Sequence, residues 1–156
     1  MNATIIKDII IPGVVVLGGG IGGAITIYIY YRNSKLRRAE WLYSLFEKFF
    51  YQSMYADIRR LLDYDNEEQI NRLRETIRCH SEITLEEKLI DYLNFFEFIS
   101  SLWRLRQLPI KEIRMMFDYY IRRLGDYDFI MEYLQEQGFE GLLQLVSEVR
   151  KMNEVK

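Results

Sequence analysis

Residues 9–31 read IIIPGVVVLGGGIGGAITIYIYY, a run of twenty-three residues without a charge between Asp8 and Arg32. At about 1.5 Å per residue a helix of this length reaches roughly 34 Å, which is enough to cross a hydrocarbon core of about 30 Å with some tilt. We therefore predict a single transmembrane helix within an amino-terminal anchor, residues 1–34. Residues 35–156 are expected to form a separate domain.

Two other interpretations of this run lack the sequence context that they need. Gly18, Gly20 and Gly23 form a GxGxxG pattern, but a dinucleotide-binding fold also requires an amphipathic helix and a second strand after the glycines. Neither follows here. A cleaved signal peptide would have a shorter apolar region that ends in a small-residue cleavage site, whereas this run continues to Tyr31. An uncleaved signal-anchor fits the pattern better.

Basic residues gather immediately after the run. This basic collar consists of Arg32, Lys35, Arg37 and Arg38. Because an excess of Lys and Arg stays on the cytoplasmic side of a membrane, the short amino terminus is expected to face outward and the domain to face the cytoplasm. Tyrosines just before the collar suit the headgroup level of the bilayer.

Glycine is unusually dense in the middle of the run, at Gly18, Gly19, Gly20, Gly22 and Gly23. Small residues four apart let helices approach each other closely in lipid. Gly18 with Gly22 and Gly19 with Gly23 make two such pairs. We expect these glycines to pack helix against helix, or to line a pore, in a homo-oligomer. The alternative is a lone, flexible anchor.

Composition limits the chemistry of the domain. From Arg32 onward, 20 Lys and Arg stand against 22 Asp and Glu, and this balance does not favour direct binding of nucleic acid. A single cysteine, Cys79, excludes an internal disulfide, and with its neighbour His80 it cannot form a structural zinc site. We expect neither a metal nor a cofactor.

Helical periodicity runs through the whole domain without a convincing strand, and short connections favour antiparallel neighbours, so we predict an all-α bundle. Its first helix should continue the anchor with little break. Ser53, Asp65 or Asn66, and Asp126 are expected N-caps, and Pro109 is expected to mark a helix start.

The longest domain helix is predicted to open at a capping box of Thr84 and Glu87 and to run to about Gln107. Two apolar faces indicate that it is surrounded by other helices. One face holds Leu85, Leu89, Tyr92, Phe96, Ile99 and Trp103, and the other holds Phe95, Phe98, Leu102 and Leu105. Glu97 is expected to pair with an arginine from a neighbouring helix, or alternatively to line a cavity or a subunit contact.

Arg74 and His80 have the R-x4-6-H spacing of HEPN ribonucleases and are the weak catalytic candidates of the sequence. Six residues on a straight helix turn the two side chains apart by about 240°. His80 then falls in line with Leu73 and Ile77 on a buried seam, and only a break near Cys79 would bring it to Arg74. We expect a capping or core histidine instead. No other nucleophile and base form a convincing set.

The glycine-rich span, the basic collar and residues 85–99, LEEKLIDYLNFFEFI, together resemble the small membrane accessory proteins of type VI-B CRISPR systems. These proteins belong to a wider group of one-span bacterial proteins with a divergent HEPN-like helical domain. The resemblance implies a ring-forming homo-oligomer, such as an octamer, in the bacterial inner membrane. It implies a pore without enzyme activity that permeabilises or depolarises the membrane and strengthens antiphage defence by an RNA-guided effector nuclease.

Two alternative functions stay open. One is a membrane-tethered HEPN-type ribonuclease that uses Arg74 and His80. The other is an anchored adaptor that captures a cytoplasmic partner.

Overall fold

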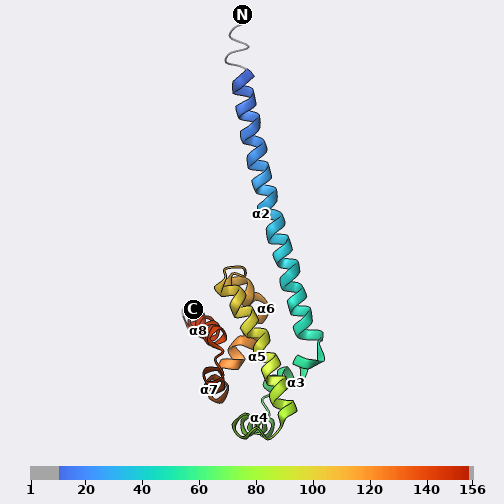
Figure 1. Cartoon of the computed structure of the whole chain (residues 1–156), viewed down its shortest axis with the longest axis vertical. Helices are drawn as coiled ribbons and strands as arrows, with labels where there is room; N and C mark the ends of the chain where they lie inside the picture. The colour runs from blue at the N-terminus through green and yellow to red at the C-terminus, as the bar shows by residue number, and fades with distance from the viewer. Residues whose placement is uncertain (1–10, 155–156) are drawn as a thin grey trace, which may run out of the picture. The chain divides into compact units, whose positions relative to one another are not determined.

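The structure, a computed structural model, describes the backbone of residues 11–154 and the side chains of residues 26–153. Within this range the chain is all-helical, as predicted (Figure 1). The helices are α2 (Ile11–Tyr51), α3 (Ser53–Tyr64), α4 (Glu67–Cys79), α5 (Ile83–Arg104), α6 (Ile110–Gly125), α7 (Asp128–Glu136) and α8 (Glu140–Glu154).

Helix α2 is 41 residues long and belongs to both compact units of the chain, Met1–Ser44 and Leu45–Lys156. The predicted continuation of the anchor helix into the first helix of the domain is confirmed, because α2 does not break between residues 31 and 51. The predicted boundary between residues 34 and 35 stays a prediction.

Among the residues that the structure describes, no helix has both the length and the apolarity that crossing a membrane requires. Most of the predicted span, residues 9–31, has no described side chains: residues 9 and 10 are not described at all, and only the backbone is described for residues 11–25.

Helix α5 is the centre of the second unit, as predicted, and contacts α3, α4, α6 and α8. Figure 1 shows α3 on one side of α5 and α8 on the other. Leu89, Tyr92, Phe96 and Ile99 are completely buried. On the second predicted face Phe95 and Leu102 are buried, whereas Phe98 and Leu105 are exposed. The apolar core therefore covers most, but not all, of the surface of α5.

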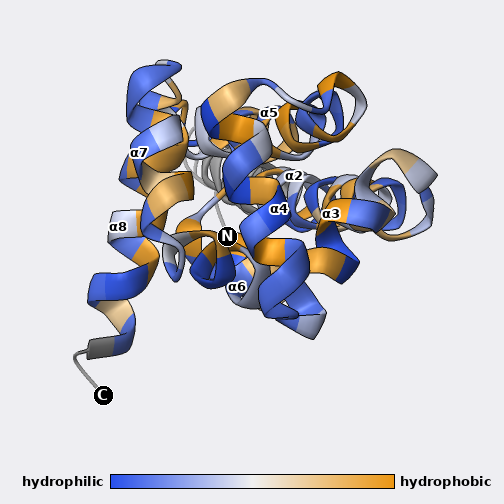
Figure 2. Cartoon of the chain, turned by 90° about the horizontal axis from the view of Figure 1, so that it is seen from below, coloured by the Kyte–Doolittle hydropathy of each residue, from blue (hydrophilic) through white to orange (hydrophobic). Residues whose placement is uncertain are grey.

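Polar and apolar faces separate clearly around this core. Figure 2 shows hydrophilic residues along the outward faces of α4 and α8 and apolar residues turned toward the interior of the bundle. The buried seam predicted for α4 is confirmed at Leu73, which is buried together with Ile70, whereas Ile77 is half-buried. Amphipathic helices of this kind gain most of their stability by burying one face against their neighbours.

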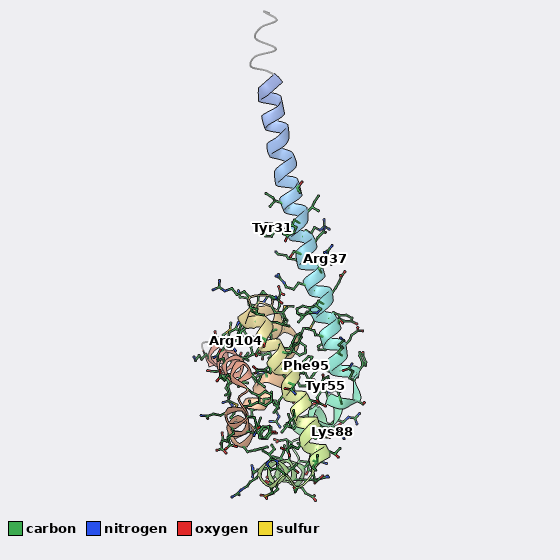
Figure 3. The ribbon with its side chains drawn as sticks, in the orientation of Figure 1. Tyr31, Arg37, Tyr55, Lys88, Phe95 and Arg104 are labelled. Carbon is green, nitrogen blue, oxygen red and sulfur yellow. The ribbon has the colours of Figure 1, made fainter. Side chains whose placement is uncertain are left out.

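The last turns of α2 bring Phe49 into the aromatic core. Its ring lies 5.1 Å from the ring of Phe95 and 5.3 Å from that of Phe96, centre to centre. The ring of Tyr55 in α3 packs on the same cluster, 5.3 Å from the ring of Phe95 and tilted against it by 51°. Figure 3 labels both side chains. Aromatic pairs at such separations add about 0.5–1.5 kcal/mol beyond the burial of area. This cluster joins α2 to α3 and α5 within the second unit.

Some helix starts follow local sequence signals. Asn66 is the N-cap of α4, and its side chain accepts a hydrogen bond from the backbone N–H of Gln69 at 3.2 Å. Pro109 precedes α6 directly. Both predictions are confirmed, because the signal and the helix that it starts are neighbours in the chain.

Other predicted caps are wrong. Helix α5 begins at Ile83, so Thr84 already lies inside its first turn and cannot form a capping box. The N-cap of α5 is Glu82, whose carboxylate instead accepts a hydrogen bond from Arg72 at 2.5 Å. Ser53 is likewise the first residue of α3, after the N-cap Gln52. The cap of α7 is Tyr127, one residue after the predicted Asp126.

Glu97 does not meet an arginine, and this prediction is wrong. Its carboxylate accepts hydrogen bonds from the backbone N–H groups of Gly141 at 3.2 Å and Leu142 at 2.6 Å, in the first turn of α8. Positive backbone N–H groups at a helix start favour a carboxylate. A Cβ at Gly141 would lie 2.6 Å from a Glu97 carboxylate oxygen, so a larger residue here would force that carboxylate to shift. Glu97 thus caps a helix far from it in sequence.

Arginine side chains cap the opposite ends of helices, where backbone carbonyl groups lack partners. Arg59 of α3 donates to the carbonyl oxygens of Phe49 at 2.6 Å and Phe50 at 3.1 Å, at the end of α2. Arg123 of α6 donates to that of Leu62 in α3 at 2.8 Å, and Arg150 of α8 donates to that of Gly125 in α6. These bonds satisfy carbonyl groups that the helices themselves leave unpaired.

Candidate functional site

The glycines Gly18, Gly19, Gly20, Gly22 and Gly23 lie on α2, in the part for which only the backbone is described. A continuous helix over these residues keeps the glycines four apart on one face, since 3.6 residues make one turn. Their predicted roles in helix packing or in a pore stay predictions.

The basic collar lies further along α2. Arg32, Lys35 and Arg37 are exposed and Arg38 is half-buried. Figure 3 shows Tyr31 and Arg37 projecting outward from the helix. Tyr28, Tyr30 and Tyr31 just before the collar are exposed as well. Aromatic rings and cations therefore follow one another on an open helix surface, which is the arrangement that an interface between lipid and water favours.

Arg74 and His80 line one hollow between α4 and α7, of about 550 Å³. Its other lining residues are Ile77, Arg78, Phe129, Glu132, Tyr133, Glu136 and Gln137. The guanidinium of Arg74 lies 5.1 Å from the centre of the Phe129 ring and donates to the Asn71 side chain at 2.9 Å. The structure thus brings together the two residues that a straight helix would separate.

The cause is the end of α4. The helix stops at Cys79, and His80 follows as its C-cap in the left-handed conformation, with φ 51°. The prediction that His80 continues the buried seam of Leu73 is therefore wrong: Leu73 is completely buried, whereas the side chain of His80 is 67% exposed. The alternative role as a capping residue is confirmed by its position.

A carboxylate holds the His80 ring in place. The Nδ1 atom of His80 lies 2.9 Å from both carboxylate oxygens of Glu86, in the first turn of α5. Because an ionised carboxylate only accepts hydrogen bonds, Nδ1 carries the proton, and in the neutral ring Nε2 is left as the basic nitrogen. The hydroxyl of Tyr133 interacts with the same carboxylate. Burial, together with the negative charge of Glu86, raises the pKa of the Tyr133 hydroxyl.

The charges of the hollow do not favour a polyanion. Arg74 and Arg78 are balanced by Glu132 and Glu136 along the same walls. An oriented imidazole and a guanidinium that line one hollow are able to move a proton and to contact one phosphate, but nothing here concentrates a strand of RNA electrostatically.

Sequence reasoning missed Glu86 and Tyr133. Glu86 reaches His80 only because the chain turns between α4 and α5, and Tyr133 comes from a helix more than fifty residues further on. Neither residue belongs to a local motif. Within residues 26–153, no group of three or more His, Cys, Asp or Glu side chains is placed to hold a metal ion.

Comparison with protein-family models, with curated proteins and with solved structures found no match to this chain.

Proposed function

We propose that the chain is a membrane-anchored protein that assembles through its amino-terminal helix into a ring and forms a pore in the bacterial inner membrane. Following the resemblance drawn from the sequence, the pore permeabilises or depolarises that membrane in support of an RNA-guided antiphage effector nuclease. The helical domain, of the divergent HEPN-like kind, faces the cytoplasm and carries the contacts that connect the pore to its trigger.

The observation that carries the proposal is the continuity of α2. One helix runs from the uncharged, glycine-dense stretch through the basic collar to Tyr51 without a break. Its 41 residues extend to roughly 60 Å at about 1.5 Å per residue, which is twice the thickness of a hydrocarbon core. A helix of this kind offers one end to lipid and the other to the folded domain.

Self-association supplies what a single helix lacks. Lipid gives apolar side chains little reason to associate, so helices in a bilayer assemble where small residues allow close contact. The pairs Gly18–Gly22 and Gly19–Gly23 offer such contacts on adjacent faces. Copies that contact one another through two different faces form a closed ring when the rotation from one copy to the next adds up to a full turn. With no charge between residues 9 and 31, the passage would be lined by backbone and apolar groups and would open by wetting.

The test uses the full chain in detergent and in vesicles. The wild type should have a mass of many copies and should collapse an imposed membrane potential, whereas Gly19→Leu and Gly22→Leu should reduce both. Ile21→Leu is the matched control, because it places leucine between those glycines without adding volume. An unchanged particle size in both glycine variants would contradict the pore. A monomer that leaves the potential intact would favour the anchored adaptor.

A second candidate function has one specific observation in its favour. Arg74 and His80 line the same hollow, and Glu86 orients the imidazole as a general base would require. The purified full chain should then cleave RNA, and Arg74→Ala and His80→Ala should abolish the cleavage. Arg104→Ala, an exposed arginine outside the hollow, is the control. A wild type that leaves RNA intact would exclude this candidate.

A further inference from the structure

One face of α2 is hollowed at the level of the basic collar. The hollow has a volume of about 530 Å³ and is lined by Tyr28, Ile29, Arg32, Asn33, Lys35 and Leu36. These residues recur at intervals of three and four, so their side chains share one face of the helix. All of them belong to the first compact unit.

The polar groups of this face are all suited to an anion. Arg32 offers a planar fork of N–H donors, and Lys35 offers an ammonium group one turn away. The amide of Asn33 adds a neutral donor. No carboxylate lines the hollow, and the first acidic residue after Asp8 is Glu40. A phosphate group would therefore meet donors here without a competing negative charge.

The apolar groups lie at the two ends of the same face. Tyr28 and Ile29 lie on the side of the proposed membrane span, and Leu36 lies on the other. A ligand that fits the whole face is negatively charged at its centre and apolar on the side of the span. A phospholipid has this division, and a free inorganic phosphate does not. Zwitterionic lipids carry a cation that Arg32 and Lys35 would repel, so the charge favours an anionic headgroup.

We propose that this face of α2 is a binding site for the phosphodiester headgroup of an anionic phospholipid. Arg32 contacts the phosphate oxygens with two N–H groups, Lys35 neutralises the remaining charge, and the Tyr28 ring lies against the glycerol region. The inference rests on the proposed membrane anchoring and adds a specific lipid to it. Such a site would fix the depth and rotation of each helix in a ring.

The experiment compares two arginines of equal charge on different faces of the helix. Arg37 follows Arg32 by five positions, which places its side chain about 140° around the helix from that of Arg32, and it does not line the hollow. The full chain is reconstituted in vesicles of equal parts phosphatidylcholine and phosphatidylglycerol and extracted gently. The phosphatidylglycerol retained on each protomer is then counted by native mass spectrometry. The Arg32→Gln variant should bind this lipid about fivefold more weakly, and Arg37→Gln should bind it as the wild type does.

Each other result overturns the inference. Equal losses in the two arginine variants would mean a diffuse attraction between the collar and the membrane instead of a site. Equal retention of the two lipids by the wild type would remove the anionic selectivity, and displacement of the lipid by added inorganic phosphate would assign the site to a free anion. A chain that stays out of the vesicles altogether would overturn the membrane anchoring as well, whereas the preceding results would leave the anchoring intact.

Discussion

In the compact unit that begins at Leu45, Phe49 and Phe96 are completely buried, whereas on α2 Ile27 and Ile29 are 58% and 50% exposed. Both regions hold large apolar residues, but along residues 27–31 these side chains are exposed, whereas in the second unit the chain itself removes most of them from water. Burying an apolar side chain is worth about 1.5–3 kcal/mol, so a row of exposed ones calls for another apolar partner. For α2 we propose that this partner is lipid together with further copies of the same helix.

The first prediction tests the buried side of this comparison and has the largest expected effect. Phe49→Ala should destabilise the bundle by about 3–5 kcal/mol, because it removes a ring at the centre of the aromatic core and leaves a cavity. Chemical denaturation followed by tryptophan fluorescence measures the change. Tyr51→Ala is the matched control on the same helix: its side chain is 83% exposed, and it should cost less than about 0.5 kcal/mol. Similar losses in the two variants would contradict the assigned core.

The second prediction concerns the cap that joins α5 to α8. Glu97→Ala should destabilise the bundle by about 1–3 kcal/mol, because two backbone N–H groups at the start of α8 lose their acceptor. Glu97→Gln keeps one acceptor oxygen and should cost less. Glu87→Ala, at an exposed position of the same helix, should have little effect on the denaturation midpoint. If the alanine variants at 87 and 97 proved equally stable, the cap would contribute nothing.

The third prediction tests the exposed side. Ile27→Asn should change the unfolding free energy of the bundle by less than about 0.5 kcal/mol, because this side chain is 58% exposed and belongs to the first compact unit. The same change should lower the fraction of the protein recovered with membranes, since a polar residue in the span disfavours insertion. Denaturation in detergent and membrane fractionation measure the two effects. A destabilised bundle together with normal recovery in the membrane fraction would contradict the assignment of Ile27 to the lipid-facing region.

The fourth prediction, with the smallest effect, is a dependence on pH at the loop between α3 and α4. The Tyr127 hydroxyl donates to Asp65 at 2.6 Å, and with Arg123 it lowers the pKa of that carboxyl. Because the pKa is lower in the folded state, the stabilisation is complete above the ordinary pKa of about 3.9 and is lost as the pH falls through the lowered value.

The variant Asp65→Asn should therefore be less stable than the wild type at neutral pH, and the two should converge below about pH 4. Asparagine also suits the left-handed backbone at this position, with φ 50°, so the substitution tests the charge alone. Thermal unfolding over a series of pH values measures the difference. A difference that stays constant down to acid pH would show that the carboxyl charge is not its cause.

Local signals in the sequence predicted much of the fold. The all-α class, the central position of α5, the cap at Asn66 and the start after Pro109 each depend on residues within a few positions of one another. Periodicity and capping are short-range effects, so a single sequence contains them.

Contacts between distant residues could not be predicted in the same way. Glu97 meets the start of α8 across 44 residues, and Arg123 meets the end of α3 across 61. A charged residue within an apolar helix indicates that a polar partner exists, but it does not indicate which residue that partner is. The hollow of Arg74 and His80 was missed because His80 adopts a left-handed conformation that glycine or asparagine would have signalled more clearly.

The most direct test of the central claim, that the amino-terminal run lies in the membrane with the domain on the cytoplasmic side, uses the single cysteine. Cys79 is exposed on the surface of the bundle, so a membrane-impermeant maleimide reaches it wherever the domain is open to the medium. We predict no labelling in intact cells with a permeabilised outer membrane, complete labelling in inside-out inner-membrane vesicles, and recovery of the chain with the membranes. Labelling in the intact cells, or recovery of the chain in the aqueous fraction, would contradict the claim.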